Sequence, residues 1–477
     1  MIKVLPTPKI CQDIDGGVLE IPFSICAIDN KFKAEIEVFL DYFKRVFKKD
    51  ITQKCGGITL KYDISIAADA YIIDSKDDKL YLMASDKEGL LYGFSTLLQI
   101  ISVNGNSISV PRLHMEDFPD KEYRSVMIDL GRKWHTMDQI LKFVDLCFIY
   151  KINYLHLHFV DTERYSLPSK AFPKLAIEGE SYTFDEIKYL NDYAFARGIN
   201  LVPETECPGH ASSITRQYPE VFANVFDGES GNFYTELGAV IDESSLLCAG
   251  SKKAFDATLT LIDEMIALFP NSKYIHIGGD EAPIKLWNQC PHCREYMKNN
   301  NLKDVYDLYS EYIGRVVDHV LSLGKTPIVW EGFPKLGSDR ISKEAIVMAW
   351  ESHYHLVTDL LDEGFTVINV SWQPLYIVPS LVRRWSPEDI LNWNVYNWQH
   401  WWQHSEATLN PITVPATDKV LGATLCSWEL TFEQEISRVM ENLIAMNERV
   451  WNTRRRLPYS DYCGTFKHIF NIAALII

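Results

Sequence analysis

The sequence predicts a (β/α)8 TIM barrel preceded by a small α/β domain. From about residue 124 onward, eight short apolar segments alternate mostly with longer amphipathic ones, the pattern of strands and helices in such a barrel. Most of the short segments end in polar or aromatic residues, and barrel enzymes carry their chemistry at these strand ends. A doubly wound open sheet is the alternative, but it would favour a GxGxxG loop after the first strand, and the sequence has none.

The region before the barrel is predicted to mix strands and helices. AYIID (70–74) and KLYLMA (79–84) are predicted strands around a turn, and KEGLLYGFSTLLQIIS (87–102) has helical periodicity. The polar, proline-containing stretch PRLHMEDFPDKEY then resembles a linker. The sequence therefore predicts an N-terminal α/β domain over 1–118 and a catalytic barrel over 119–477.

The barrel elements follow from the alternation of apolar strands with amphipathic helices. Helices are predicted over 137–151 and 184–198, and Gly198 is placed as the stop of the second. The predicted strands are 125–132, 154–160, 200–204, 274–280, 326–332, 345–351, 366–372 and 421–428.

The bulk composition excludes some classes of partner. The chain has 477 residues, of which 47% are hydrophobic and 23% charged, enough for a large core in two or three domains. A net charge of -17 argues against nucleic acid and anionic membranes, because both select basic patches. No apolar run reaches membrane-spanning length. The N-terminus, MIKVLPTPKI, lacks the apolar stretch of a signal peptide, so a cytoplasmic location is expected, or a secreted or periplasmic one if a leader was removed.

The cysteines give no sign of a metal centre in the sequence. Ten are scattered along the chain, too few for a disulfide scaffold of this size, so most thiols are expected to be reduced. Cys290 and Cys293 form one CPHC pair, but a four-cysteine zinc site needs a second pair and none follows. We therefore predict neither a metal nor a cofactor.

The stretch YIHIGGDE places two carboxylates side by side after two glycines. Strand alternation predicts that His276, Gly278 and Asp280 face the barrel interior, with Glu281 one step beyond. Two close carboxylates in different environments can hold different pKa values, as glycoside hydrolysis requires. Adjacent residues are poorly placed to flank one glycosidic bond, so one is expected to serve as acid/base and the other to orient a substrate group.

HIGGDE (276–281) resembles the catalytic signature of the family 20 glycoside hydrolases, the β-N-acetylhexosaminidases. The resemblance covers nearly the whole chain, because YRSVMIDLGR (123–132), HLHFVDT (156–162) and VPETECPGHA (202–211) resemble the family's first three barrel strands in order. It implies exo-acting, retaining hydrolysis that releases terminal GlcNAc or GalNAc from a glycan or oligosaccharide. The substrate's own 2-acetamido oxygen would attack the anomeric carbon and form an oxazolinium intermediate.

The resemblance also implies roles for individual residues. Glu281 would be the acid/base, and Asp280 would accept a hydrogen bond from the acetamido N–H. The remaining implied substrate-binding residues are Arg132, which binds sugar hydroxyls, Asp161, His210, the pocket walls Trp330, Trp350 and Trp428, Tyr376 for the acetamido oxygen, and Glu429 for the sugar O4.

Several positions depart from the family's usual pattern. These are Lys133, Thr162, Glu206, Val378 and the missing glycine between Trp428 and Glu429. They leave open how the sugar hydroxyls are read and whether GlcNAc or GalNAc is preferred. Residues 383–402 carry five tryptophans and are predicted to form a loop or helical insert after the seventh strand. Packing against the barrel is expected for most of these tryptophans, and lining of a leaving-group subsite is the alternative for some.

The sequence leaves three alternative functions open. A metal-dependent amidohydrolase could use His156, His158, His210, His276 and Asp280, although the HxH pair then lies on the second strand rather than the first. A non-catalytic sugar-binding protein would usually have lost the acid, and Glu281 is present. A family variant could act on a disaccharide or a modified, for example sulfated, terminal sugar, whereas Arg132 favours a single terminal sugar.

Overall fold

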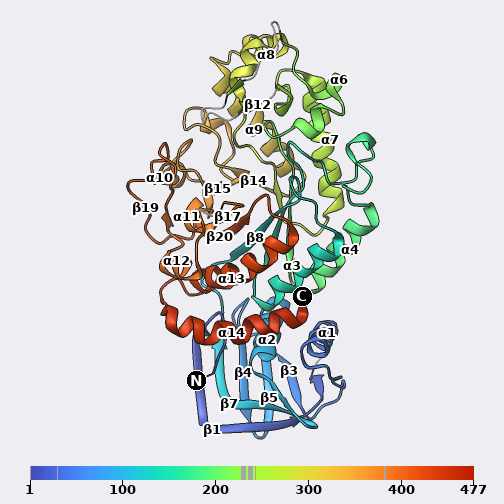
Figure 1. Cartoon of the computed structure of the whole chain (residues 1–477), viewed down its shortest axis with the longest axis vertical. Coiled ribbons are helices and arrows are strands. Elements are labelled where there is room, and N and C mark those ends of the chain that lie inside the picture. Colours follow the sequence, from blue (N-terminus) through green and yellow to red (C-terminus); the bar gives the residue numbers. More distant parts are fainter. Residues whose placement is uncertain (1, 29–30, 227–232, 235–239, 242, 381–382) are drawn as a thin grey trace.

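A mixed sheet with its helices occupies one end of the molecule, and a closed parallel barrel occupies the other (Figure 1). The structure is a computed structural model that describes residues 2–28, 31–226, 233–234, 240–241, 243–380 and 383–477. Within this described part of the chain, none of the helices combines the length and apolar character needed to span a bilayer.

The N-terminal sheet has seven strands. The hairpin predicted at 70–74 and 79–84 is present as β4 and β5, which pair antiparallel. In spatial order the strands are β1 (Ile10–Pro22), β7 (Ser107–Asp117), β4 (Tyr71–Lys76), β5 (Lys79–Ala84), β3 (Ile58–Tyr62) and β2 (Ile25–Ala27), with β6 (Ser102–Asn104) beside β7. A disulfide joins Cys26 and Cys55, and the other eight cysteines are free.

Two helices cover the face of this sheet that lies toward the barrel, α1 (Ile36–Phe47) and α2 (Lys87–Ile100) (Figure 1). The side chain of Asp86 caps α2 by accepting a hydrogen bond from the N–H of Gly89 at 2.8 Å. Every residue of α2 from Gly89 to Ile100 is buried. A helix that is covered on all sides needs partners all round, and α2 packs on β4, β5, α1, α3 and α14.

The barrel is closed by eight parallel strands, as predicted. Each strand pairs with the next, and the last pairs with the first. In order they are β8 (Tyr123–Asp129), β9 (Tyr154–His158), β10 (Asn200–Glu204), β13 (Tyr274–His276), β14 (Thr326–Trp330), β15 (Ile346–Ala349), β16 (Thr366–Asn369) and β20 (Val420–Ser427).

Most of the predicted barrel strands run two or more residues past their observed ends, and the fourth differs in the way that matters for the site. The prediction carried the fourth strand to residue 280, but β13 ends at His276. Gly278 and Gly279 have φ values of +71° and +102°, which L side chains rarely adopt, so the chain turns out of the sheet at the glycines. Asp280 and Glu281 therefore lie on a loop above the strand, and alternation along the strand does not place them.

Helices surround the barrel. The two predicted helices are present as α3 and α4, and each begins at a capping box, formed by Thr136 with Gln139 and by Thr183 with Glu186. The outer helices are α3 (Met137–Ile149), α4 (Phe184–Ala196), α7 (Lys252–Leu268), α9 (Val305–Ser322), α10 (Val357–Asp362) and α13 (Phe432–Trp451), and α14 (Tyr459–Ile476) crosses the junction with the N-terminal sheet (Figure 1).

Shorter elements occupy the loops above the strands. They are α5 (Ser212–Thr215), α6 (Pro219–Phe222), β11 (Phe233–Tyr234), β12 (Val240–Ile241), α8 (Pro291–Asn299), α11 (Trp372–Leu375), β17 (Tyr376–Ile377), α12 (Pro387–Asn392), β18 (Asn397–Trp398), β19 (Ile412–Thr413) and the 3-10 turns Pro173–Leu175, Glu243–Ser245, Ile284–Gln289 and Ser338–Arg340.

The tryptophan-rich stretch 383–402 does follow the seventh barrel strand, β16. It forms α12 and the first strand of the β18–β19 hairpin. Trp393 and Trp398 are buried, and the Nε1 of Trp398 donates to the carbonyl of Ala349 at 2.9 Å. These two side chains therefore pack the insert onto the barrel, as expected.

A buried polar cluster connects the N-terminal sheet to the barrel. Asp117, the last residue of β7, accepts hydrogen bonds from the hydroxyl of Tyr71 at 2.7 Å and from the Nε1 of Trp451 at 2.8 Å. The ammonium of Lys151, which follows α3, lies 3.2 Å from the same carboxylate. All of these side chains are buried, so the junction contains a satisfied polar network inside the hydrophobic core.

Candidate active site

Glu204, at the end of β10, is the centre of the polar network at the barrel mouth. It lies in register with His158 on β9 and His276 on β13, so these side chains meet at one level. Its carboxylate accepts from His156 Nε2 at 2.9 Å, His158 Nδ1 at 2.6 Å and Trp330 Nε1 at 2.5 Å, and it lies 3.0 Å from His276 Nδ1. Burial alone would raise the pKa of Glu204, but the neighbouring histidines bring it well below the usual range.

These contacts bear on the metal-dependent alternative. Each of the four histidines that an amidohydrolase could use has one ring nitrogen in contact with a carboxylate, whereas His156 Nδ1 and His276 Nε2 have no partner among the described residues. His158 contacts Glu204 through Nδ1 and Asp161 through Nε2 (2.9 Å), which leaves neither nitrogen available. The indole N–H of Trp330 also points at Glu204, and a donor hydrogen cannot share that space with a cation.

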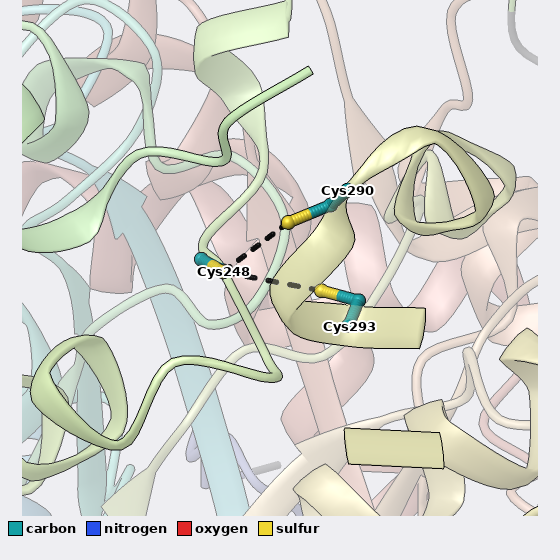
Figure 2. Close-up of side chains that lie close together, drawn as sticks. All are labelled: Cys248, Cys290 and Cys293. Atoms are coloured by element: carbon teal, nitrogen blue, oxygen red, sulfur yellow. Dashed lines mark hydrogen bonds between the residues drawn. The ribbon is translucent and has the colours of Figure 1, made fainter. Parts of the chain in front are cut away.

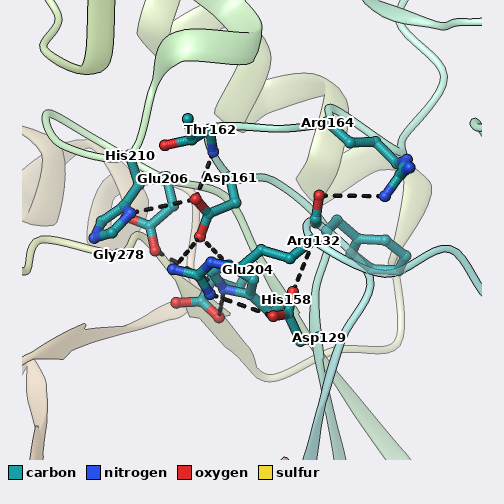
Figure 3. Close-up of polar contacts among 12 residues, drawn as sticks. Asp129, Arg132, His158, Asp161, Thr162, Arg164, Glu204, Glu206, His210 and Gly278 are labelled. Atoms are coloured by element: carbon teal, nitrogen blue, oxygen red, sulfur yellow. Dashed lines mark hydrogen bonds and ion pairs between the residues drawn. The ribbon is translucent and has the colours of Figure 1, made fainter. Parts of the chain in front are cut away.

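A chain of charges runs from Glu204 to the rim of the mouth (Figure 3). His158 reaches Asp161, and Asp161 pairs with Arg132 at 2.7 Å, while Arg132 also lies 3.3 Å from Asp129. Burial would raise the pKa of Asp161, but His210 and Arg132 hold it well below its usual range. Arg132 also lies over the Trp428 ring at 5.1 Å. The cations on this side of the mouth therefore keep the Asp161 carboxylate ionised.

His210 links this network to the two adjacent carboxylates. Its Nδ1 lies 3.3 Å from Asp161 Oδ1, and its Nε2 lies 3.4 Å from Glu281 Oε2 and 3.9 Å from Asp280 Oδ2. Burial would lower the pKa of His210, but the charge of Asp161 and the hydrogen bonds to Asp161 and Glu281 raise it well above normal. A protonated His210 therefore lies between three carboxylates.

Asp280 and Glu281 differ in exposure although they are neighbours. Asp280 is buried, whereas Glu281 is partly exposed and takes a left-handed backbone with φ of +45°. Gly278 is required beneath them, because a Cβ there would collide with the carboxyl of Glu206. The close approach of the two chain segments thus fixes where Asp280 emerges.

The environment of Asp280 suits a carboxylate that accepts a hydrogen bond from a bound ligand. Burial, reinforced by the charges of Glu281 and Glu204, raises its pKa to about 6, although His210 works in the opposite direction. Its Oδ1 is buried and accepts no hydrogen bond from the described residues. A buried acceptor without a donor is costly, and a bound N–H would relieve that cost.

Aromatic side chains form the walls of the mouth beside Asp280. Trp330 ends β14, Trp350 follows β15, Tyr376 begins β17 and Trp428 follows β20. The Trp350 and Tyr376 rings are nearly parallel, at 11° and 6.2 Å, and Trp428 lies 6.1 Å from Tyr376 and 6.0 Å from Trp330. The charge of Asp280 helps burial to keep the pKa of Tyr376 well above normal, which places the phenol within electrostatic reach of that carboxylate. The Nε1 of Trp428 is buried and has no partner among the described residues.

The structure thus brings together nearly all of the predicted site residues. Glu429 is the outlier, because its side chain is exposed at the rim, where its charge reaches Arg132. Its backbone N–H donates to Asp129 Oδ2 at 3.2 Å.

Three carboxyl groups of the site were not among the predicted residues: Glu204, Glu206 and Glu351. Glu206 is fully buried, and burial with the charges of Asp280 and Glu204 raises its pKa well above normal. Burial with the charges of Glu281 and Asp280 raises the pKa of Glu351 to about 9. The polar strand ends could have drawn attention to Glu204 and Glu351, but only the fold shows how close they lie.

A parallel barrel whose mouth combines adjacent carboxyls with a cluster of aromatic side chains fits the class of glycoside hydrolases. Residues 122–454 match the family model described as glycosyl hydrolase family 20, catalytic domain, and residues 32–118 match that of domain 2 of the same family. The chain therefore belongs to glycosyl hydrolase family 20, which confirms the resemblance seen in HIGGDE.

Relatives and solved structures agree with this membership. The chain is 26% identical over 403 residues to a beta-hexosaminidase of Vibrio furnissii (79% of this chain, 64% of that protein) and 24% identical over 510 residues to one of Porphyromonas gingivalis (97% and 62%). It thus spans less than two thirds of the length of these relatives.

The fold matches an exo beta-N-acetylglucosaminidase of Vibrio harveyi solved with N-acetylglucosamine (TM-score 0.84, 20% identity, 99% of this chain and 77% of that one). It also matches a mutant Streptomyces plicatus beta-hexosaminidase in complex with product, GlcNAc (TM-score 0.78, 21% identity, 99% and 96%).

Proposed function

We propose that this protein is an exo-acting, retaining β-N-acetylhexosaminidase that cleaves terminal N-acetylhexosamine from glycans. The observation that carries the proposal is Asp280, a buried carboxyl near a cluster of aromatic rings, with one acceptor oxygen unused and the carboxyl of Glu281 next to it. The relatives named beta-hexosaminidase and the neighbours solved with N-acetylglucosamine support the same substrate class.

The spacing of the two carboxyls favours a nucleophile supplied by the substrate. An oxygen of Asp280 and one of Glu281 lie within 4.8 Å of each other and of His210, on a single loop. Glycosidases with a protein nucleophile place their two carboxyls about 5–5.5 Å apart on opposite sides of the sugar. Neighbouring residues of one turn leave no room for a sugar ring between them, so one carboxyl serves the leaving group and the other serves the acetamido group.

The reaction then has two steps. The acetamido oxygen attacks the anomeric carbon, the bond to the aglycone breaks, and Glu281 gives its proton to the leaving oxygen. Asp280 accepts a hydrogen bond from the acetamido N–H, and its negative charge balances the positive charge of the oxazolinium ion. Glu281 next takes a proton from water, the water oxygen bonds to the anomeric carbon, and the ring opens to restore the acetamide. Two inversions retain the configuration, and the intramolecular attack replaces a bimolecular one.

The side of the mouth where Arg132 pairs with Asp129 and Asp161 would bind the rest of the sugar. The guanidinium of Arg132 lies over the Trp428 ring, and its ion pairs with Asp161 and Asp129 fix its orientation. A guanidinium that is fixed by Asp161 and Asp129 can bind neighbouring hydroxyls with little loss of side-chain entropy. Such a group at the end of the pocket suits a terminal sugar better than an internal one.

The test compares an aryl N-acetyl-β-glucosaminide with the matching aryl β-glucoside, which lacks the acetamido group. We expect cleavage of the first alone, and rates lowered on all substrates by Asp280→Asn. Cleavage of both would show a protein nucleophile and overturn the mechanism. Cleavage of neither, with release from a sulfated or disaccharide-capped glycan, would assign the site to such a substrate. Wild-type rates in both Asp280→Asn and Glu281→Gln would remove the site assignment.

A further inference from the structure

Three buried thiols converge outside the catalytic site (Figure 2). Cys248 lies in the long connection between β10 and α7, and Cys290 and Cys293 lie at the start of α8, in the connection that follows β13. The Sγ of Cys248 is 3.7 Å from that of Cys290 and 3.9 Å from that of Cys293. All three sulfurs lie within 4.8 Å of one another, and all three residues are buried.

These separations fit a shared metal ion. Thiolates bind zinc at about 2.3 Å in a tetrahedron, whose edge is then about 3.8 Å between sulfurs. A disulfide needs sulfurs about 2.05 Å apart and can join only two of the three. Cys26 and Cys55 are bonded in this structure, whereas the three thiols remain apart and face a common point.

We propose that Cys248, Cys290 and Cys293 form a structural zinc site. Soft thiolate ligands in tetrahedral arrangement select zinc from the common divalent cations. The fourth ligand would be an oxygen, from Asn224 or from water. The Oδ1 of Asn224 lies 3.7 Å from Cys293 Sγ, and its Nδ2 donates to the carbonyl of Leu246 at 2.8 Å, which turns the oxygen toward the thiols.

The sequence pattern concealed this site. A search for zinc ligands looks for a second CxxC pair, but the third ligand here is a single cysteine that lies 42 residues before Cys290. Only the packing of two barrel loops brings it to the CPHC pair.

The site would join two loops that carry catalytic residues. The connection after β10 holds His210 and Cys248, and the connection after β13 holds Glu281 and Cys290. The loops already touch near the thiols, because a Cβ at Gly250 would collide with the carbonyl of His292. A bound zinc would therefore fix the position of His210 relative to the carboxylate pair, in the manner of a structural rather than a catalytic ion.

The decisive experiment measures metal in the whole protein, purified without chelators. We expect about one zinc ion per chain, the stoichiometry of a single structural site. Cobalt(II), loaded in place of zinc, should show the sulfur-to-metal charge transfer and the intense visible bands of tetrahedral thiolate coordination. The cobalt spectrum uses the wild-type chain, so it does not depend on whether a variant folds.

Cys248→Ser, Cys290→Ser and Cys293→Ser should each lose the zinc and lower the melting temperature. The matched control is Cys463→Ser, which removes an exposed free thiol and should keep both. The proposal is overturned if the wild type holds no zinc and gives no thiolate–cobalt spectrum. It is equally overturned if mass spectrometry of the unreduced chain finds a disulfide between two of the three cysteines.

Discussion

The two sides of the barrel mouth bury carboxyl groups to a similar degree, but they shift the pKa values of these groups in opposite directions. Where β8 and β9 end, Asp129 and Asp161 contact Arg132, and Asp161 also contacts His158 and His210. Where β13 and β15 end, Asp280 and Glu351 lie near other acids, and the pKa of each is raised, to about 6 and about 9, although His210 lies 3.9 Å from Asp280 and His400 lies 3.3 Å from Glu351.

The difference shows that burial alone does not decide the charge of a carboxyl group. Desolvation raises the pKa on both sides, and a cation within contact distance reverses that shift on one side only. The paired side is suited to binding uncharged hydroxyls in a fixed geometry. The unpaired side is suited to proton transfer and to stabilising a cation formed during the reaction.

The largest expected effect comes from the acid on the unpaired side. Glu281→Gln should lower kcat/KM about 10²–10⁴-fold for substrates with poor leaving groups, because no proton reaches the leaving oxygen. Activated aryl substrates need less protonation and should retain more of their rate. Steady-state kinetics on both substrates checks this, with the exposed Glu295→Gln as the control. Equal losses on both substrates would contradict an acid role.

Removing Arg132 should lower both the stability of the fold and the affinity for the sugar. Arg132→Ala leaves Asp129 buried without its cation and removes one of the three cations that contact Asp161, so the free energy of unfolding should fall by about 3–5 kcal/mol. KM should also rise, because sugar hydroxyls lose their donor. Denaturant titration and kinetics measure the two effects. Lys188→Ala breaks an exposed ion pair with Asp192 and should leave the free energy of unfolding nearly unchanged. A comparable loss in both variants would show that the ion pairs of Arg132 stabilise the fold no more than an exposed pair does.

The pH dependence of kcat/KM should reflect the ionisation of Asp280. In the proposed mechanism its ionised form stabilises the oxazolinium charge, so kcat/KM should decline on the acid side of a bend near pH 6. The charge of Glu281 helps to raise this pKa, so Glu281→Gln should move the bend to lower pH on an activated substrate. An unmoved bend in that variant would assign the titration to another group.

The same raised pKa predicts a gain of stability on mutation. A carboxyl whose pKa is raised on folding stabilises the fold when protonated, and that contribution is lost as pH rises through about 6. At neutral pH Asp280 therefore destabilises the fold, and Asp280→Asn should raise stability by on the order of 1–3 kcal/mol. Melting curves at pH 5 and pH 8 test the sign, because the gain should shrink at the lower pH. A larger gain at pH 5 would contradict it.

The smallest effect should come from Glu351. Its pKa of about 9 keeps the carboxyl protonated at neutral pH, so Glu351→Gln replaces one neutral group with another. Activity at pH 7 should stay within about twofold and stability within about 0.5 kcal/mol of wild type. Asp161→Asn is the contrasting variant, because that carboxylate is ionised and pairs with Arg132. Similar losses in both variants would mean that the two sides do not differ as described.

Most of the barrel could be predicted from local patterns. Apolar strands separated by amphipathic helices fix the order of elements, and the strand at 200–204 was predicted at its observed bounds. The end of β13 could not be predicted in this way. The alternation of side chains in the sequence continues through Gly278 and Gly279, but the positive φ values of these two residues end the strand before them. HIGGDE still identified Asp280 and Glu281, since a motif does not depend on where the strand stops.

The network around the motif could not be predicted in the same way. Glu204 binds side chains from its own strand's two neighbours, and Glu351 matters only because loops bring it toward Asp280 and Glu281. Cys248 reaches Cys290 through a contact between loops. Sequence patterns show which residues are neighbours along one helix or strand. The residues of this network lie on different strands and loops, so their contacts appear only in the folded structure.

The polar cluster at Asp117 has a consequence for how the molecule can be divided. Lys151 and Trp451 belong to the barrel side of the junction, yet their polar atoms depend on a carboxylate from the last strand of the N-terminal sheet. A barrel released from that sheet would expose the apolar surface that α2 covers and leave Lys151 without its buried counter-ion. The two parts should therefore melt in one transition, and a protease should not liberate a stable barrel.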